Sequence, residues 1–130
     1  MPLRVLLTSD HPAVRESLRS LLEATPGMDV IVALADRADC LGQAATCVPD
    51  VVVIDGVPGS ATERLVSILH QAHPETAIIV LAMHADCSHI QAALGAGARG
   101  YLLKETAARE MGAALRAVTA GQIYLGAHLA

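Results

Sequence analysis

The sequence lacks the features that a membrane, secreted or nucleic-acid-binding protein needs. None of its apolar runs approaches the roughly 20 residues of a membrane-spanning helix, and the start, MPLRVLLTSDHP, has no signal-peptide pattern. Its three cysteines, Cys40, Cys47 and Cys87, are odd in number and not closely paired, which favours reduced thiols over a disulfide framework. The net charge is −4, and the Lys and Arg residues are scattered. We expect a cytoplasmic protein with no membrane contact that by itself is a poor candidate to bind DNA.

The chain also lacks internal linkers, sequence repeats and low-complexity stretches. Its 130 residues are the length of one domain that can bury a sufficient core without a metal or a disulfide. The tail GQIYLGAHLA is interpreted as a terminal turn or the start of a linker.

Five apolar strands alternate with five amphipathic segments along the chain. The first helix is expected to be capped by Asp10 or His11, with Pro12 near its first helical position, and the last is expected to be capped by Thr106. Strands that are apolar throughout, each followed by a helix of ten or more residues, indicate a parallel sheet covered on both faces. The expected strands are 3–9, 29–35, 51–55, 77–83 and 100–104. The helix after the third strand is expected to bury Leu65, Ile68, Leu69 and Ala72 on one face.

Charged residues follow three of these strands. Ligands of such sheets bind outside the carboxyl ends of the strands, where Asp10, Asp55 and Lys104 should therefore meet. Two neighbouring carboxylates repel unless a cation or a proton intervenes, and oxygen ligands suit Mg²⁺. An ammonium group opposite them suits a phosphoryl group. The pattern predicts that Asp55 is a nucleophile that accepts a phosphoryl group, and that Mg²⁺ and Lys104 stabilise its oxygens.

The segments RVLLTSDHPAVRESLRSLLE, PDVVVID, AGARGYLLKE and ALRAVTAGQIYL resemble the receiver domains of NarL/LuxR-type response regulators. The resemblance implies a flavodoxin-like (CheY-like) (βα)5 fold with strand order 2-1-3-4-5. It assigns residues 1–125 to a receiver domain that is not an enzyme, and residues 126–130 to the start of a linker to a DNA-binding domain outside this chain. It further implies a sensor histidine kinase or another signalling protein as partner, Mg²⁺ as cofactor, and a homodimer formed through the first and fifth helices or through the fourth helix, fifth strand and fifth helix.

The resemblance also implies roles for individual residues. They are Asp55 as phosphoacceptor, Asp10 as one member of an acidic metal-binding pair, Lys104 as the phosphate contact, Tyr101 as the switch aromatic, and Val57 as the residue whose backbone carbonyl completes the metal shell.

Three departures from the family pattern accompany these matches. Ser9 stands where the family has a second acid, which weakens the metal site. Ala82 ends the fourth strand where the family has a Thr or Ser hydroxyl that contacts the phosphoryl group and draws in the switch aromatic. The loop after Asp55 is one residue shorter than usual, which puts the place of Val57 in doubt. Losing one charge-assisted hydrogen bond costs roughly 1.5–3 kcal/mol, which is comparable with the coupling energy of about 1–3 kcal/mol in a typical allosteric switch.

These departures favour an atypical receiver whose Asp55 is phosphorylated slowly or not at all and which acts through its fold, dimerisation or partner contacts. The alternative is an ordinary Mg²⁺-dependent phosphoacceptor switched by a histidine kinase. A remote alternative, a flavodoxin-like enzyme that binds flavin or a nucleotide, is disfavoured because TSDHP places an acid and a proline where a phosphate cradle would need Gly, Ser or Thr. Tyr101 is compatible with a permanently buried or a permanently exposed position. His84, Cys87 and His89 could ligate a soft metal, but their spacing is not a standard zinc pattern.

Overall fold

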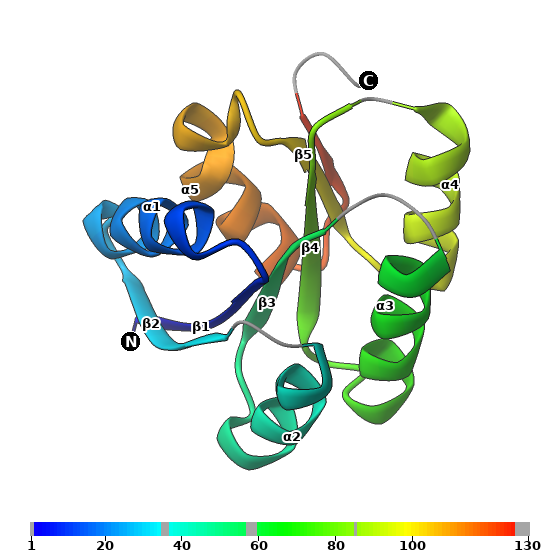
Figure 1. Cartoon of the computed structure of the whole chain (residues 1–130), viewed down its shortest axis with the longest axis horizontal. Coiled ribbons are helices and arrows are strands. Elements are labelled where there is room, and N and C mark those ends of the chain that lie inside the picture. The colour runs from blue at the N-terminus through cyan, green and yellow to red at the C-terminus, as the bar shows by residue number, and fades with distance from the viewer. Residues whose placement is uncertain (1, 35–36, 57–59, 85, 127–130) are drawn as a thin grey trace.

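The computed structural model describes residues 2–34, 37–56, 60–84 and 86–126, and strands and helices alternate along these ranges. The strands are β1 (Leu3–Ser9), β2 (Met28–Leu34), β3 (Val51–Asp55), β4 (Ala77–Ala82), β5 (Gly100–Leu103) and β6 (Tyr124–Leu125). The helices are α1 (Pro12–Ala24), α2 (Arg37–Cys47), α3 (Ser60–Ala72), α4 (Cys87–Ala96) and α5 (Ala107–Thr119). The sheet forms the middle layer, with α1 and α5 on one face and α2, α3 and α4 on the other (Figure 1).

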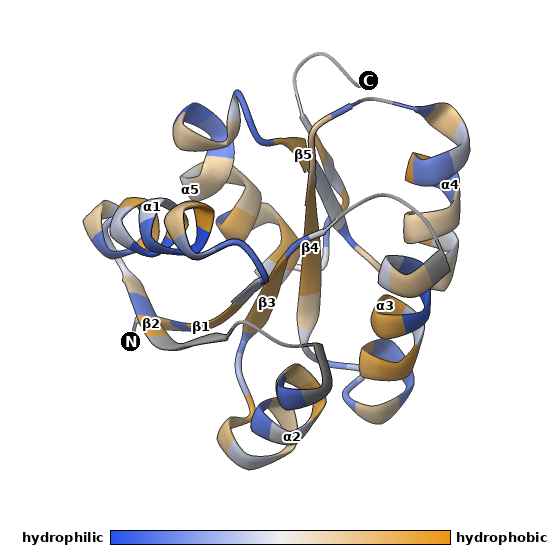
Figure 2. Ribbon diagram, viewed as in Figure 1, coloured by the Kyte–Doolittle hydropathy of each residue, from blue (hydrophilic) through white to orange (hydrophobic). Residues whose placement is uncertain are grey.

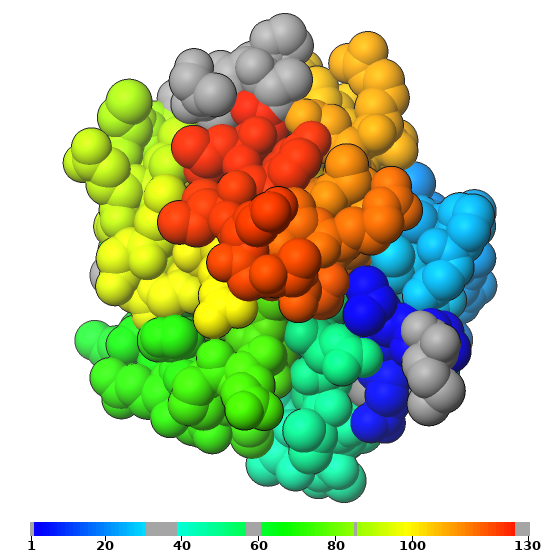
Figure 3. Space-filling view, turned by 180° about the vertical axis from the view of Figure 1, so that it is seen from behind, coloured from blue at the N-terminus to red at the C-terminus, as the bar shows by residue number. Residues whose placement is uncertain are grey.

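The described strands form one parallel sheet in the order β2-β1-β3-β4-β5-β6. The predicted order 2-1-3-4-5 is confirmed, but the prediction of five strands is wrong. Tyr124 and Leu125 pair with Gly100 and Tyr101, so part of the tail expected to be a turn or a linker is a sixth strand. A strand of two residues is too short to show periodicity in a sequence. Figure 3 shows this C-terminal segment in red on the surface, beside α5 in orange; residues 127–130 lie outside the described part.

The two faces of the sheet carry separate apolar cores, because alternate residues of a strand point to opposite sides. Val53 and Leu102 pack in the core on the α1 and α5 side, whereas Ile54 and Tyr101 pack in the core on the opposite side. Figure 2 shows that the central strands are hydrophobic along most of their length. The predicted helix stripe is wrong at two positions, since Ile68 is 42% exposed and Ala72, in the last turn of α3, is exposed as well. None of the described helices is long and apolar enough to cross a membrane.

Side chains at the helix N-termini fix the loops that surround the carboxyl edge of the sheet. His11 is the N-cap of α1, and its Nδ1 accepts a hydrogen bond from the Val14 backbone N–H at 3.4 Å. Asp86 caps α4 by accepting from the Ser88 backbone N–H at 2.9 Å. Thr106 stands at the N-cap position of α5, but its side chain caps no backbone N–H. The cap of α1 is therefore His11, and Asp10 remains in the loop after β1.

Two of the residues with positive φ, Gly97 and Val48, differ in what that conformation means for the structure. Gly97, with φ of 125°, ends α4 where a Cβ atom would overlap the His70 ring of α3, so glycine allows these two helices to approach closely. Val48, with φ of 46°, follows α2 and is 61% exposed. A β-branched residue rarely adopts this conformation, so the backbone at Val48 is strained.

Candidate functional site

Asp55 and Lys104 form an ion pair at the carboxyl edge of the sheet. Asp55 ends β3 and its side chain is 3% exposed, while Lys104 follows β5 and its side chain is 25% exposed. The Lys104 Nζ atom lies 2.5 Å from Asp55 Oδ1. The Lys104 backbone N–H donates to the Ala82 carbonyl at 2.9 Å, which anchors the lysine next to the end of β4. The structure thus brings together two of the residues that the sequence places at this edge.

Ser9 contacts the same carboxylate from the other side. Ser9 and Asp55 are register partners at the ends of the neighbouring strands β1 and β3, and Ser9 is 1% exposed. The Ser9 hydroxyl donates a hydrogen bond to Asp55 Oδ2 at 2.8 Å. Oδ1 faces Lys104 in the ion pair but has no hydrogen-bond partner among the described residues, so Ser9 supplies the hydrogen bond that this carboxylate receives. The sequence predicted a loss of charge at Ser9 but did not predict this hydrogen bond.

Asp10 and Arg15 add one charge of each sign near Ser9. Asp10 follows Ser9 directly and is exposed to solvent. Arg15, from the first turn of α1, donates from Nη1 to the Ser9 carbonyl oxygen at 2.9 Å. The contact of Arg15 with Ser9 was not predicted from the sequence. Arg15 follows Ser9 by six residues and lies in the first turn of a helix expected to start near Pro12, and this spacing could have indicated the contact.

The described oxygen donors do not match those of a typical Mg²⁺ site. Such a site needs several oxygen ligands, of which carboxylates supply the charge. Across the described ranges, no group of three or more His, Cys, Asp or Glu side chains is close enough to hold a metal ion. Ser9 is neutral, and both oxygens of Asp55 are engaged by Ser9 and Lys104. The predicted ligand Val57 lies outside the described residues. The described residues therefore fit a carboxylate paired with an ammonium and a hydroxyl group better than a resident Mg²⁺.

Ala82 and Tyr101 are both buried in the core on the α3 and α4 side of the sheet. Ala82 is 0% exposed and Tyr101 is 1% exposed. The Tyr101 hydroxyl is buried and has no hydrogen-bond partner among the described residues. Burial, followed by the negative charges of Asp86 and Glu63, raises the pKa of Tyr101 above its usual value. Of the two positions compatible with the sequence, the structure therefore shows the buried one.

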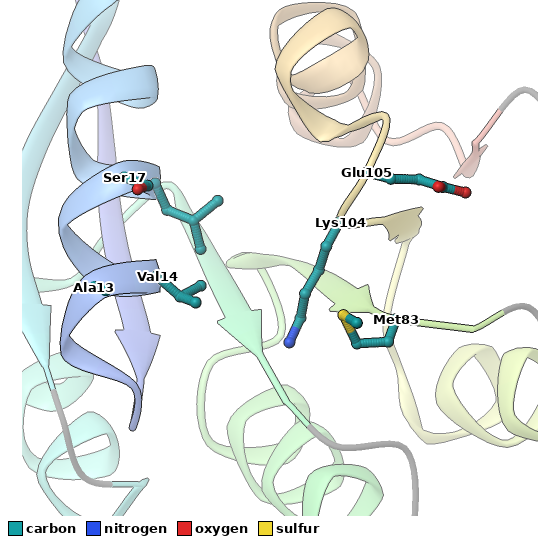
Figure 4. A pocket seen from close by; sticks show the side chains of 7 residues that line it. Ala13, Val14, Ser17, Met83, Lys104 and Glu105 are labelled. Atoms are coloured by element: carbon teal, nitrogen blue, oxygen red, sulfur yellow. The ribbon is translucent and has the colours of Figure 1, made fainter.

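A surface pocket of about 450 Å³ gives access to Lys104. Figure 4 shows Lys104 extending from the end of β5 into the space between α1 and Met83. Met83 is 63% exposed, so a large apolar side chain lies at the rim of the charged site. The pocket is lined by Ala13, Val14, Ser17, Leu18, Met83, Lys104 and Glu105. A partner that enters this pocket would contact apolar surface together with the side chains of Ser17, Lys104 and Glu105.

The candidate soft-metal ligands do not form a cluster. His84 and Cys87 are exposed, and His89 lies with its Nδ1 3.7 Å from Glu63 Oε2 on α3. Within the described segments no metal-binding group of His, Cys, Asp and Glu includes them. The interaction of His89 is therefore a contact between α3 and α4.

Comparisons with known proteins agree with this geometry. Residues 5–116 match the model of the response regulator receiver domain. The chain is 35% identical over 133 residues to the transcriptional regulatory protein LiaR of Bacillus subtilis and 31% identical over 121 residues to the nitrate/nitrite response regulator protein NarP of Escherichia coli. A crystal structure of a LuxR-family two-component response regulator from Aurantimonas sp. SI85-9A1 superposes with a TM-score of 0.91 at 30% identity, covering 99% of this chain and 93% of that one.

The chain spans only part of the curated relatives that it matches. The LiaR alignment covers 98% of this chain and 61% of LiaR, and the NarP alignment covers 92% of this chain and 56% of NarP. The similarity therefore concerns one domain of those proteins.

Proposed function

This chain belongs to the response regulator receiver family, and we propose that it is the signal-input domain of a two-component transcription regulator that acts mainly through its fold and partner contacts. In this proposal Asp55 is phosphorylated slowly or not at all. Residues 1–125 are the receiver domain, and residues 126–130 begin a linker to a DNA-binding domain. Response regulators of this kind work with histidine kinases and bind DNA through another domain; we propose that this chain does the same and forms a homodimer.

The observation that carries the proposal is the buried Tyr101 beside the alanine that ends β4. In an ordinary receiver a hydroxyl on β4 links the phosphoryl group to the switch aromatic. Ala82 has no hydroxyl, and Tyr101 is 1% exposed. Because no side-chain group on Ala82 can report phosphorylation to Tyr101, the position of Tyr101 should be independent of phosphate. The signalling surface should then be set by partners instead.

The Asp55–Lys104 ion pair favours a second candidate, the ordinary phosphoacceptor. In that reaction an Asp55 carboxylate oxygen attacks the phosphorus of a phosphohistidine, the P–N bond breaks, and the imidazole keeps the electron pair. Lys104, whose Nζ lies 2.5 Å from Asp55 Oδ1, would offset negative charge on the phosphoryl oxygens. The geometry of the acceptor and its lysine supports this chemistry, whereas Ser9 and Ala82 argue against its speed and its coupling to Tyr101.

A direct test measures covalent phosphorylation of Asp55. The protein is incubated with acetyl phosphate and MgCl2 and weighed by intact mass spectrometry, with Asp55→Asn as control. We expect little or no gain of a phosphoryl group. A complete gain that is absent from Asp55→Asn would overturn the proposal in favour of the ordinary phosphoacceptor. In parallel, sedimentation measures the oligomeric state with and without acetyl phosphate, which we expect to be the same.

A further inference from the structure

We propose that Ser9 makes the Asp55 site independent of divalent metal, because its hydroxyl takes the place of a metal ion as the partner of the carboxylate. The proposal rests on the function proposed above only in taking Asp55 as the acceptor position. The proposal assigns Ser9 a positioning role toward Asp55. A neutral residue that only removed the charge of an acid would not have this role. A metal ligand is lost at position 9, and a hydrogen-bond donor to Asp55 is gained.

The ion pair and the hydrogen bond of the buried carboxylate support this role. A buried carboxylate needs partners for both oxygens, because an unsatisfied charged acceptor in a low-dielectric interior is costly. Lys104 supplies one partner at Oδ1, and the Ser9 hydroxyl supplies the other at Oδ2, 2.8 Å away. Ser9 is 1% exposed and holds its place at the end of β1 opposite Asp55, so this donor is fixed by the sheet. Protein groups thus face both oxygens of Asp55: Oδ1 is paired by charge with Lys104 and has no hydrogen-bond partner among the described residues, and Oδ2 accepts the hydrogen bond from Ser9.

The local charges support the same conclusion. Lys104 pairs with Asp55, and the Ser9 hydroxyl adds no charge beside that carboxylate. An acid at position 9 would place a second carboxylate against Asp55. Like charges at that distance repel unless a cation lies between them. With Ser9 in place, the repulsion that a divalent cation would relieve is absent.

The test compares thermal unfolding in EDTA and in MgCl2, with NaCl added to equal ionic strength. The variants are Ser9→Asp, which restores the acid, Ser9→Thr, which keeps a hydroxyl, and Ser20→Asp, which adds the same charge on an exposed position of α1. We expect the midpoints of wild type, Ser9→Thr and Ser20→Asp to be unaffected by MgCl2. Ser9→Asp should unfold at a lower temperature in EDTA and regain about 4 °C or more in MgCl2.

Two outcomes would overturn the proposal. One is a wild-type midpoint that rises with MgCl2 as far as that of Ser9→Asp. The other is a Ser9→Asp protein whose midpoint ignores MgCl2, since residue 9 would then not decide metal dependence. If Ser9→Asp does not fold, Ser9→Ala decides. A midpoint about 4 °C or more below that of Ser9→Thr, unchanged by MgCl2, supports the hydroxyl as the partner of Asp55, and equal midpoints contradict it.

These readouts are separate from the test of phosphorylation. A magnesium-independent wild type that is nevertheless fully phosphorylated by acetyl phosphate would overturn the proposed function and leave the role of Ser9 intact. A magnesium-stabilised wild type that gains no phosphoryl group would do the reverse.

Discussion

Replacing Tyr101 with phenylalanine should stabilise the domain. The Tyr101 side chain is 1% exposed and its hydroxyl has no hydrogen-bond partner among the described residues. A buried, unsatisfied hydroxyl costs about 1–3 kcal/mol of folding free energy. Removing it leaves a void of about one atom, which costs at most about 0.5 kcal/mol. The Tyr101→Phe variant should therefore gain about 1 kcal/mol in the free energy of unfolding.

Urea unfolding followed by circular dichroism measures this gain. With a slope of about 1–3 kcal/mol/M, the midpoint should rise by about 0.5 M while the slope stays unchanged. Tyr124→Phe is the matched control, because the chain has only two tyrosines and the Tyr124 hydroxyl donates to Glu110 Oε1 at 3.1 Å. This control should be neutral or slightly destabilised. A Tyr101→Phe midpoint below that of wild type would refute the reasoning, because it would mean that the hydroxyl is satisfied in solution.

Two further predictions concern the backbone strain at Val48 and the buried thiol of Cys40. Val48→Asn should raise the free energy of unfolding by about 1 kcal/mol, because Asn tolerates a φ of 46°. Val48→Thr is the control, because Thr is still β-branched and should not raise it. Equal urea midpoints for the two variants would exclude strain as the cause. Burial raises the pKa of Cys40 from 9.0 to about 11, so the folded state disfavours the thiolate. The buried neutral thiol therefore contributes to stability below pH 9, and this contribution should fall by roughly 2–3 kcal/mol as the pH rises to 11. Cys40→Ala should show a smaller fall in urea midpoint between pH 9 and 10, and an unchanged fall would contradict the assignment to Cys40.

The fold could be predicted from sequence because each buried strand has a pattern of its own. Val51 to Ile54 are apolar throughout and are followed by a helix, which is typical of a strand buried on both faces. The helix cap at His11 was one of two alternatives, and geometry decided between them. The strand Tyr124–Leu125 was not predicted because two residues carry no period, and its pairing with Gly100 and Tyr101 depends on the tertiary structure.

The candidate site could be predicted in its residues but not in its contacts. The rule that parallel strands end at one edge is enough to place Asp55 and Lys104 together. It does not specify that Ser9 donates to Asp55, because a serine after a strand can contact its own loop, its neighbour or water. Only the register of β1 against β3, which places Ser9 opposite Asp55, fixes that choice.

Two of the three departures from the family pattern, Ser9 and Ala82, belong to opposite faces of the sheet. Val53, two residues before Asp55 on β3, and Leu7, two residues before Ser9 on β1, pack in the core on the side of α1 and α5, whereas Ala82 and Tyr101 lie in the core on the side of α3 and α4. In an ordinary receiver the hydroxyl at the end of β4 connects these two environments. With alanine there, the chemistry of the carboxylate and the packing of the tyrosine are separate properties of the domain. The substitutions at positions 9 and 82 therefore need not compensate each other, and Ser9 and Ala82 can both be present without loss of the fold.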